Sequence, residues 1–320
     1  MVAALNAALR DSLRDDPRVL VYGEDVASLG GVFRVTNGLR DEFGPHRVFD
    51  TPISEAGIVG AAVGLAFAGW KSVVEMQFDA FSYPAFEQVV DHVAKMRMRT
   101  RGRVGMPIVL RIPAFGGIRG KEHHGESPET YYVHTAGLKV LAPAFPLDAY
   151  RLLRLAIADP DPVVFLEPKA RYWSKETGDL TTDGPGIGRA TVVRHGAACT
   201  IVTYGAAVGR CLDAADMIAA ADGHAVQVVD LRSLSPLDLD LLERVVRETG
   251  RVIVVHEAPR TLGMGAEIAA RVMELGFDHL EAPVSRVTGW DTPYPPAALE
   301  QAWLPSVERI AAAVRSTVSY

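Results

Sequence analysis

The sequence alternates short apolar runs rich in β-branched residues with longer amphipathic stretches, and this alternation restricts the fold more than any other feature. A short apolar run fits a strand buried on both faces, and the amphipathic stretch after it fits a crossover helix. Repetition of this pair predicts a parallel α/β sheet. In the first half of the chain the expected strands are Val19–Tyr22, Arg47–Phe49, Ser72–Glu75, Ile108–Ile112, Lys139–Leu141 and Val163–Leu166. The expected helices are Ser54–Ala68, Phe81–Met98 and Pro146–Ala158.

The alternation stops between Lys175 and Gly188, where Gly, Thr, Asp and Pro predominate. We expect a linker there. A chain of 320 residues exceeds the roughly 250–300 residues at which one core stops growing, so two domains are expected. The expected division is a domain over residues 1–175, a linker over 176–188 and a smaller α/β domain over 189–320. In this second domain the expected strands are Thr200–Tyr204, Ala225–Asp230 and Val252–His256, and the expected helices between and after them are Ala206–Ala221, Leu237–Thr249 and Gly265–Leu275. The domain closes with the short run Val284–Val287 and a helix over Pro305–Val318.

The composition excludes several classes of protein. Hydrophobic residues make up 48% of the chain and charged residues 22%, as in a soluble globular protein. The formal charge of −6 offers no basic surface to nucleic acid or to an anionic membrane. The apolar stretches are shorter than the ~20 residues of a bilayer span, and the first residues lack the pattern of a secretory signal. Cys199 and Cys211 fit core positions in a reducing cytoplasm better than a disulfide framework.

Common nucleotide, zinc and redox motifs are missing, which leaves polar residues at strand ends as the candidates for chemistry. Open α/β sheets bind their ligands at the carboxyl ends of the strands. The first candidate is Glu55, because Pro52 and Ser54 start a helix directly after an expected strand. A carboxylate in the first turn of an apolar helix is partly desolvated and suited to sharing a proton with a ring nitrogen. Simple helix capping explains the same pattern.

Glycines recur on one face of the helix that Glu55 begins, at Gly57, Gly60 and Gly64. Each glycine costs a helix about 1 kcal/mol relative to alanine. We therefore expect a neighbouring helix or a ligand to pack very close to this face.

Two further segments follow expected strands. Glu75–Phe86 holds four aromatic residues, which fit either a stacking surface for a ligand or ordinary core packing. Gly116–Ser127 is a glycine-rich loop with adjacent histidines, His123 and His124. Histidine is a natural acid, base or anion contact near neutral pH, whereas adjacent histidines suit a metal poorly. We expect His123 to be a solvated loop residue, and for His124 both interpretations stay open.

A fourth segment, Ala156–Pro162, ends an expected helix and carries Asp159 and Asp161. Two carboxylates beside free carbonyl groups are hard oxygen ligands of the kind that bind a cation. A plain turn has the same residues, so the segment alone does not decide between the two.

Taken together, these segments resemble the β subunit of the decarboxylating component of 2-oxo acid dehydrogenase complexes, of the pyruvate and branched-chain types. The resemblance covers nearly the whole chain. It is carried by VYGEDV (21–26), GGVFRVTNGL (30–39), DTPISEAGIVGAAVG (50–64), HTAGLKVLAP (134–143), DPVVFLEPK (161–169), DLRSLSPLD (230–238) and TGWDTPYP (288–295). It implies a transketolase-like α/β fold, with a parallel-sheet pyrimidine-binding domain followed by a smaller C-terminal α/β domain.

The resemblance also implies a cofactor, thiamine diphosphate, and a role for each matching residue. Glu55 would hydrogen-bond N1′ of the aminopyrimidine, Phe81 would stack on that ring, and Gln77 would lie at a nearby contact. His124 would meet the substrate carboxylate and the lipoyl group. A structural potassium site would use Ile108, Ala156, Ile157, Asp159 and Asp161.

The chain departs from the family pattern at two places. The family usually has His-Ser-Gln-Ser where this chain has His124, Gly125, Glu126 and Ser127, and the extra carboxylate bears on the histidine and on the substrate range. Asp161 stands where asparagine is common.

The GDG segment that holds the diphosphate through Mg²⁺ is absent. Acidic strand ends do not hold a diphosphate without that metal. The resemblance therefore implies an α subunit that holds Mg²⁺ in an α2β2 heterotetramer, and a lipoyl acyltransferase as the next component of the complex. The alternatives are the β subunit of acetoin dehydrogenase and a non-catalytic scaffolding relative.

Overall fold

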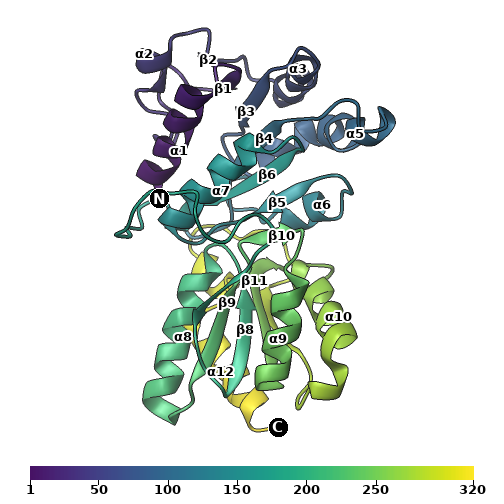
Figure 1. Cartoon of the computed structure of the whole chain (residues 1–320). Helices are drawn as coiled ribbons and strands as arrows, with labels where there is room; N and C mark the ends of the chain where they lie inside the picture. The colour runs from purple at the N-terminus through teal and green to yellow at the C-terminus, as the bar shows by residue number, and fades with distance from the viewer.

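The computed structural model describes all residues from Met1 to Tyr320 and contains two sheets, one in each half of the chain (Figure 1). The first sheet has seven strands in the order β10-β5-β6-β4-β3-β1-β2. Its strands are β1 (Val19–Gly23), β2 (Val48–Asp50), β3 (Lys71–Glu75), β4 (Ile108–Ala114), β5 (Lys139–Leu141), β6 (Val163–Pro168) and β10 (Ser233–Ser235). The six strands expected in the first half are all present and pair in parallel, which confirms the predicted sheet.

Helices cover both faces of this sheet, and most side chains along its strands are therefore apolar and buried. In β1, Val19 and Val21 join one core, whereas Leu20 and Tyr22 join the core on the opposite face. This is the two-residue period of a strand buried on both sides. The first core is shared with α1 (Val2–Asp15) and α7 (Pro146–Ala158), and the second with α3 (Glu55–Phe67).

The second sheet is smaller, with the order β12-β11-β8-β9-β7. Its strands are β7 (Thr191–Arg194), β8 (Cys199–Thr203), β9 (Val226–Asp230), β11 (Val252–Pro259) and β12 (Ser285–Gly289). It packs with α8 (Ala207–Asp222), α9 (Leu239–Thr249), α10 (Met264–Gly276) and α12 (Val307–Val318). Cys199 and Cys211 are fully buried in this domain, as expected, and burial raises the pKa of both thiols to about 12. No helix in the chain is both long and apolar enough to cross a bilayer.

The single long helix expected over Phe81–Met98 is wrong. The segment instead forms a 3₁₀ turn η1 (Ala80–Ala85), a short α4 (Phe86–Gln88), a π-helical turn η2 (Val89–Val93) and α5 (Met96–Arg99). Pro84 lies inside η1 and has no N–H to donate, so a regular helix does not continue through it. The sequence analysis did not predict the 14-residue helix α1, nor the short elements α2 (Leu39–Phe43), α6 (Glu129–Val133), β7, β10 and α11 (Glu300–Trp303).

The glycine face of α3 meets a neighbouring element at only one position. A Cβ built on Gly60 would lie 3.2 Å from Oε1 of Gln88 in α4, whereas none built on Gly64 would have a heavy atom within 4 Å. At Gly57 the near atom belongs to Ser54, which precedes the same helix. Within the chain, the predicted close packing is therefore found at Gly60 alone.

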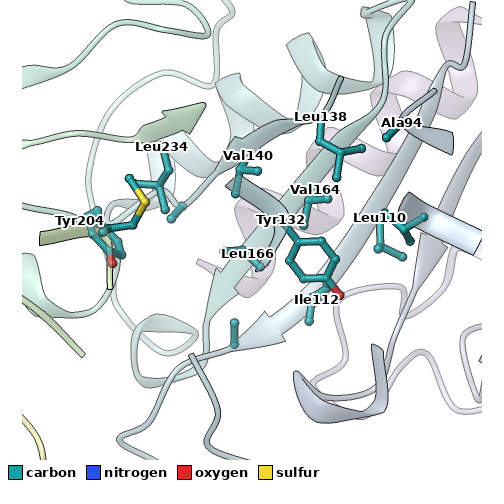
Figure 2. Close-up of a cluster of buried hydrophobic side chains, with 14 of the residues drawn as sticks. Ala94, Leu110, Ile112, Tyr132, Leu138, Val140, Val164, Leu166, Tyr204 and Leu234 are labelled. Atoms are coloured by element: carbon teal, nitrogen blue, oxygen red, sulfur yellow. The ribbon is translucent and has the colours of Figure 1, made fainter. Parts of the chain in front are cut away.

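The two halves of the chain join through β10, which comes from the C-terminal half and adds antiparallel to β5 of the first sheet. One apolar cluster runs across this junction, and Figure 2 shows Tyr204 and Leu234 beside Val140 and Leu166 of the first sheet. No helix or strand lies between Arg171 and Thr191. The division at residues 175 and 188 stays a prediction, because β10 belongs to one half in sequence and to the other in its sheet.

A buried carboxyl group, Glu129, lies at this junction. Its Oε1 accepts a hydrogen bond from the Tyr204 hydroxyl at 2.6 Å, whereas Oε2 is buried without a partner. Burial raises the pKa of Glu129 from 4.5 to about 7, and the hydrogen bond from Tyr204 opposes the rise. The folded chain therefore binds the Glu129 proton more tightly than the unfolded chain does.

We predict that Glu129→Gln removes a pH dependence of stability. A raised carboxyl pKa stabilises the fold below the ordinary value of 4.5, and this stabilisation is lost as the pH rises to about 7. The loss corresponds to about 3 kcal/mol, so Glu129→Gln should be more stable than the wild type at pH 8 and equal to it at pH 4. Urea unfolding across this range measures the difference, and Glu274→Gln, on the exposed face of α10, is the control. Parallel curves for wild type and Glu129→Gln would contradict the prediction.

Candidate active site

The residues predicted to be catalytic or to bind the cofactor gather at the carboxyl edge of the first sheet. Because β1, β2, β3, β4 and β6 are parallel, the segments that follow them leave from the same edge. Glu55 follows β2, Gln77 and Phe81 follow β3, and His124 follows β4. This edge is where open α/β sheets place their ligands.

Glu55 is the first residue of α3 and is half-buried. The helix has no side-chain cap, since Ser54 at the N-cap makes no hydrogen bond to the first turn. The Glu55 carboxylate therefore lies beside unpaired N–H groups, where the helix dipole favours a negative charge.

Glu24, directly after β1, is a neighbour of Glu55 that the earlier candidates did not include. Its side chain is buried and its Oε1 has no hydrogen-bond partner. Burial raises the pKa of Glu24, and the nearby charges of Glu55 and Asp25 raise it further. Asp25 in turn accepts a hydrogen bond from Nε2 of Gln77 at 2.8 Å. The only signal for Glu24 in the sequence was its place in VYGEDV, at the end of an apolar strand.

Other polar atoms at this edge also lack partners. Thr51 Oγ1, after β2, and Ser127 Oγ, beyond β4, are buried without a hydrogen bond, as is Glu24 Oε1. Buried polar atoms are rarely left unpaired in a finished structure. The edge therefore has the character of a surface that another polar molecule completes.

The aromatic segment after β3 forms a cluster of rings with the histidine loop. His124 lies edge-on to Phe78, with ring centroids 4.3 Å apart, and to Phe81, with centroids 5.2 Å apart. Phe78 and Phe81 meet edge to face at 5.7 Å, so the rings do not form one flat platform. The remaining two aromatics, Tyr83 and Phe86, pack against Tyr131. Phe78 and Phe81 are both half-buried and do not pack against Tyr131, so they are the two rings of the segment that a ligand could contact.

His124 is fixed in its orientation by its own loop. Nδ1 lies 2.7 Å from the Glu122 carbonyl oxygen, which accepts only, so Nδ1 carries a hydrogen. In the neutral ring Nε2 is then the free acceptor, and in the protonated ring it is a donor. His123 is exposed, as expected of a solvated loop residue. The Glu126 carboxylate lies 3.5 Å from the Tyr83 hydroxyl, a long hydrogen bond, and makes none to His124.

A buried ion pair fixes the start of the aromatic segment. Lys169, after β6, donates to the Asp79 carboxylate, and neither side chain is exposed. Asp79 also accepts from the N–H of Ala80 and begins η1. Burial raises the pKa of Asp79 and the Lys169 ammonium opposes the rise. The place of Phe78 and Phe81 thus depends on a charge that is stable in the core only because it is paired.

The residues of the expected potassium site lie at the opposite, amino edge of the sheet. Ile108 begins β4, and Asp161 lies just before β6, the neighbouring strand. Lys139 donates to both oxygens of Asp159, at 2.6 and 2.8 Å, and Arg97 lies 2.8 Å from Asp161. Both carboxylates therefore have a basic side chain within ion-pair distance, but Asp161 Oδ1 is buried without a hydrogen bond. Ala156 and Ile157 lie in the last turn of α7, next to Asp159.

No group of three or more His, Cys, Asp or Glu side chains lies close enough to hold a metal ion. The carboxyl edge thus offers isolated carboxylates and rings rather than a cluster of metal ligands. Binding of a diphosphate through a divalent cation needs such ligands, so these residues do not fit that part of the expected cofactor.

Comparison with known proteins accounts for both halves of the chain. The family model described as "Transketolase, pyrimidine binding domain" matches residues 1–174, and the model described as "Transketolase, C-terminal domain" matches residues 188–310. The solved structure "Split gene transketolase, inactive beta4 tetramer" has a TM-score of 0.79 over 99% of this chain and 97% of its own. At 24% identity, that likeness shows the fold alone.

Sequence similarity to named proteins covers nearly the whole chain. The chain is 56% identical over 310 residues to 3-methyl-2-oxobutanoate dehydrogenase subunit beta of Mycobacterium tuberculosis, covering 97% of this chain and 89% of that protein. It is 51% identical over 320 residues to pyruvate dehydrogenase E1 component subunit beta of Leifsonia xyli, covering 100% and 95%. It is 44% identical over 332 residues to 2-oxoisovalerate dehydrogenase subunit beta of Pseudomonas aeruginosa, covering 98% and 93%.

We predict that Lys169→Met lowers the free energy of unfolding by about 3–5 kcal/mol, because it leaves the Asp79 carboxylate buried without a counter-ion. Replacing both partners, Lys169→Met with Asp79→Asn, should recover part of the loss, since no charge then stays in the core. Urea unfolding of the three proteins tests this. The control is Lys95→Met, whose partner Asp91 is exposed, and its midpoint should stay close to that of the wild type. If Lys169→Met matched that control, the buried pair would not stabilise the fold.

Proposed function

The chain belongs to the β subunits of the 2-oxo acid dehydrogenases, which have the transketolase-like fold, and we propose that it supplies the aminopyrimidine side of an active site shared with an α subunit. It is one part of an oxidoreductase of the pyruvate or branched-chain type. The reaction is the oxidative decarboxylation of a 2-oxo acid and the reductive acylation of a lipoyl group. The observation that carries the proposal is the half-buried Glu55 next to the buried Glu24, at the edge that also holds the rings of Phe81 and His124.

Enzymes of this family depend in general on thiamine diphosphate, and the residues present fit its aminopyrimidine half. When bound, the cofactor supplies the carbon nucleophile that attacks the 2-oxo group. Glu55 offers a carboxylate to a ring nitrogen, and Phe81 offers a ring face. Gln77, held by Asp25 at 2.8 Å, is the nearby polar contact. The unpaired Glu24 Oε1 and Thr51 Oγ1 are further polar atoms at the same edge.

The diphosphate half does not fit this chain, because it has neither a GDG segment nor a cluster of metal ligands. We therefore assign Mg²⁺ and the diphosphate to the α subunit, in an α2β2 heterotetramer. A β subunit by name implies an α partner and a larger complex. The component that accepts the acyl group would be a lipoyl acyltransferase.

The role we assign to Glu55 is to hold a proton at the ring nitrogen N1′. Its side chain lies beside the unpaired N–H groups of the first turn. Burial raises the pKa of the neighbouring Glu24, and the charges of Glu55 and Asp25 raise it further. Glu55 is half-buried whereas Glu24 is buried, so Glu55 is the glutamate that a ring nitrogen can reach.

The role we assign to His124 is to meet the anionic substrate and to donate a proton when the dithiolane opens. One sulfur of the dithiolane takes the acyl group, and the other leaves as a thiolate that needs a proton. Because Nδ1 is bound to the Glu122 carbonyl, Nε2 is the atom that presents the proton. The edges of Phe78 and Phe81 hold the ring in this orientation.

We also propose a potassium ion at the amino edge, but with fewer ligands than the family resemblance implies. Lys139 donates to both oxygens of Asp159, whereas Asp161 Oδ1, within ion-pair distance of Arg97, is buried without a hydrogen bond. The ion would therefore be held by main-chain carbonyl oxygens of the segment that ends α7 and of Ile108, together with the Asp161 carboxylate. Its part would be structural, since it lies at the edge opposite the proposed active site.

We predict that the chain alone binds thiamine diphosphate weakly or not at all, and that activity needs the α subunit. Calorimetric titration of thiamine diphosphate with Mg²⁺, into the chain alone and into the assembled enzyme, compares the two. Micromolar, Mg²⁺-dependent binding by the chain alone would overturn the shared site.

Glu55→Gln should assemble normally yet lower the decarboxylation rate by roughly 10²–10⁴-fold, the usual effect of losing a proton-transfer group. The control is Glu267→Gln, which changes a carboxylate in the first turn of α10, away from the carboxyl edge. Turnover is measured in the assembled enzyme with an artificial electron acceptor. A Glu55→Gln enzyme that keeps more than about half of the wild-type turnover would reduce Glu55 to a helix-terminal charge.

His124→Ala should impair reductive acylation more than decarboxylation, because the proton is needed when the dithiolane opens. The lipoyl-domain assay is compared with the artificial-acceptor assay, which stops after decarboxylation. The exposed neighbour provides the control, His123→Ala, which should change neither rate. Equal losses in both assays would place His124 at the substrate carboxylate alone, and no loss in either would remove it from the site.

A further inference from the structure

The histidine loop, residues 115–126, holds an unusual backbone conformation without any helix or strand of its own. Its base is closed by a hydrogen bond from the Phe115 N–H to the Glu126 carbonyl at 2.9 Å. Phe115, Arg119 and His123 all have positive φ angles, of 72°, 56° and 68°. Residues other than glycine persist in this region only when their surroundings hold them there. The contacts around the loop therefore decide where His124 lies.

The strongest of these contacts come from the C-terminal domain. The Glu300 carboxylate, at the start of α11, accepts hydrogen bonds from the N–H groups of Gly117 at 3.0 Å and of Arg119 at 3.0 and 3.1 Å. The Tyr294 hydroxyl donates to the same carboxylate at 2.5 Å. Glu300 is completely buried, so water does not compete for these bonds.

A second carboxylate and an aromatic ring complete the contact. Glu257 of β11 accepts from the N–H of Gly116 at 2.9 Å, and it too is buried. The Tyr294 ring lies against the loop so closely that a Cβ on Gly125 would be 2.2 Å from the ring. Gly125 is also a position at which the chain departs from the usual family residue. The absence of a side chain there lets the ring reach the loop backbone.

We propose that Glu300 is a positioning residue, through which the C-terminal domain fixes the histidine loop and thereby places His124 for reaction. This rests on the role proposed for His124. The hydrogen bonds of Glu300 go to Gly117, Arg119 and Tyr294, and none goes to His124. The Glu300 carboxylate accepts hydrogen bonds from the N–H groups of a strained segment. These bonds keep the segment in one conformation before a substrate arrives.

Hydrogen exchange in the chain assembled with its α subunit tests the positioning directly. The peptide over residues 120–127 contains the amide of His124, which donates to the Lys121 carbonyl at 3.0 Å, and none of the amides bound to Glu300. With Glu300→Ala this peptide should exchange about tenfold faster, because the loop opens more often. In Glu300→Gln, which keeps one acceptor oxygen, the exchange rate of this peptide should lie between those of the wild type and Glu300→Ala. The control, Gln301→Ala, changes the exposed neighbour of Glu300 in α11 and should leave exchange unchanged.

Activity supplies the second measurement. Glu300→Ala should lower kcat in the lipoyl-domain assay by roughly tenfold, the order expected when a reacting group is displaced, while KM for the 2-oxo acid changes little. If Glu300→Ala does not fold, Tyr294→Phe replaces it, since that change removes only the hydroxyl that braces the carboxylate. For Tyr294→Phe, faster exchange in residues 120–127 together with a lower kcat supports the proposal, and unchanged exchange contradicts it.

Unchanged exchange in a folded Glu300→Ala protein would overturn the proposal, because the loop would then be held without Glu300. Faster exchange with an unchanged kcat would overturn it as well, because placement of the loop would not limit the reaction. His124→Ala distinguishes these results from a failure of the proposed function. If His124→Ala impairs acylation while Glu300→Ala does not, His124 keeps its role and only the positioning by Glu300 is wrong.

Discussion

The structure depends on one constraint: the first sheet is parallel and is covered by helices on both faces. Most side chains along its strands therefore belong to two apolar cores, and the accessible polar groups lie at the strand ends. Parallel pairing brings the carboxyl ends of β1, β2, β3, β4 and β6 to a single edge, so residues distant in sequence converge there without any special device. Glu24, Glu55, Phe81 and His124 share an edge for this reason.

Two sets of charged side chains inside this sheet and at its edge are buried as ion pairs. Arg111 lies in the middle of the sheet with no exposed surface, and it donates to Glu75 at 2.6 Å and to Glu167 at 2.7 and 2.9 Å. Lys169 and Asp79 form a second buried pair toward the carboxyl edge. A buried ion stays charged only when its partner is held at contact distance, so each pair ties together the strands or loops that carry it. These pairs make the base of the site rigid, whereas Glu55 and the histidine loop, above them, stay partly accessible.

Local patterns in the sequence were enough for most strands and helices, because each of these has a signal within a few positions. For Glu55 and His124 local patterns left two interpretations open, and the roles of Glu55, Gln77, Phe81 and His124 came from the family resemblance and stay predictions. The start of the expected Phe81–Met98 helix failed where a local rule was overlooked, since Pro84 has no N–H to donate. Nothing in the local sequence indicated the π-helical turn at Val89–Val93. The contacts of Glu257 and Glu300 are a different case. They join residues 141 and 183 positions apart, and although Glu257 follows an expected strand, nothing in the sequence near either glutamate indicates its partner in the histidine loop. Such partners become visible only when the two domains are placed together.

The strand β10 has a consequence for how the chain reaches its fold. The first sheet lacks its last strand until residues 233–235 have been made and have crossed back to β5. During synthesis β5 is therefore an open edge, with unpaired N–H and C=O groups that another chain's strand could join. Long-range pairing of this kind closes late, because the loop entropy is lost before the contacts form. The N-terminal half is thus not a free-standing module. Its completion depends on the second half. Folding of the N-terminal domain, which contains both Glu55 and the histidine loop, is therefore coupled to the synthesis of the C-terminal domain, whose Glu257 and Glu300 fix that loop.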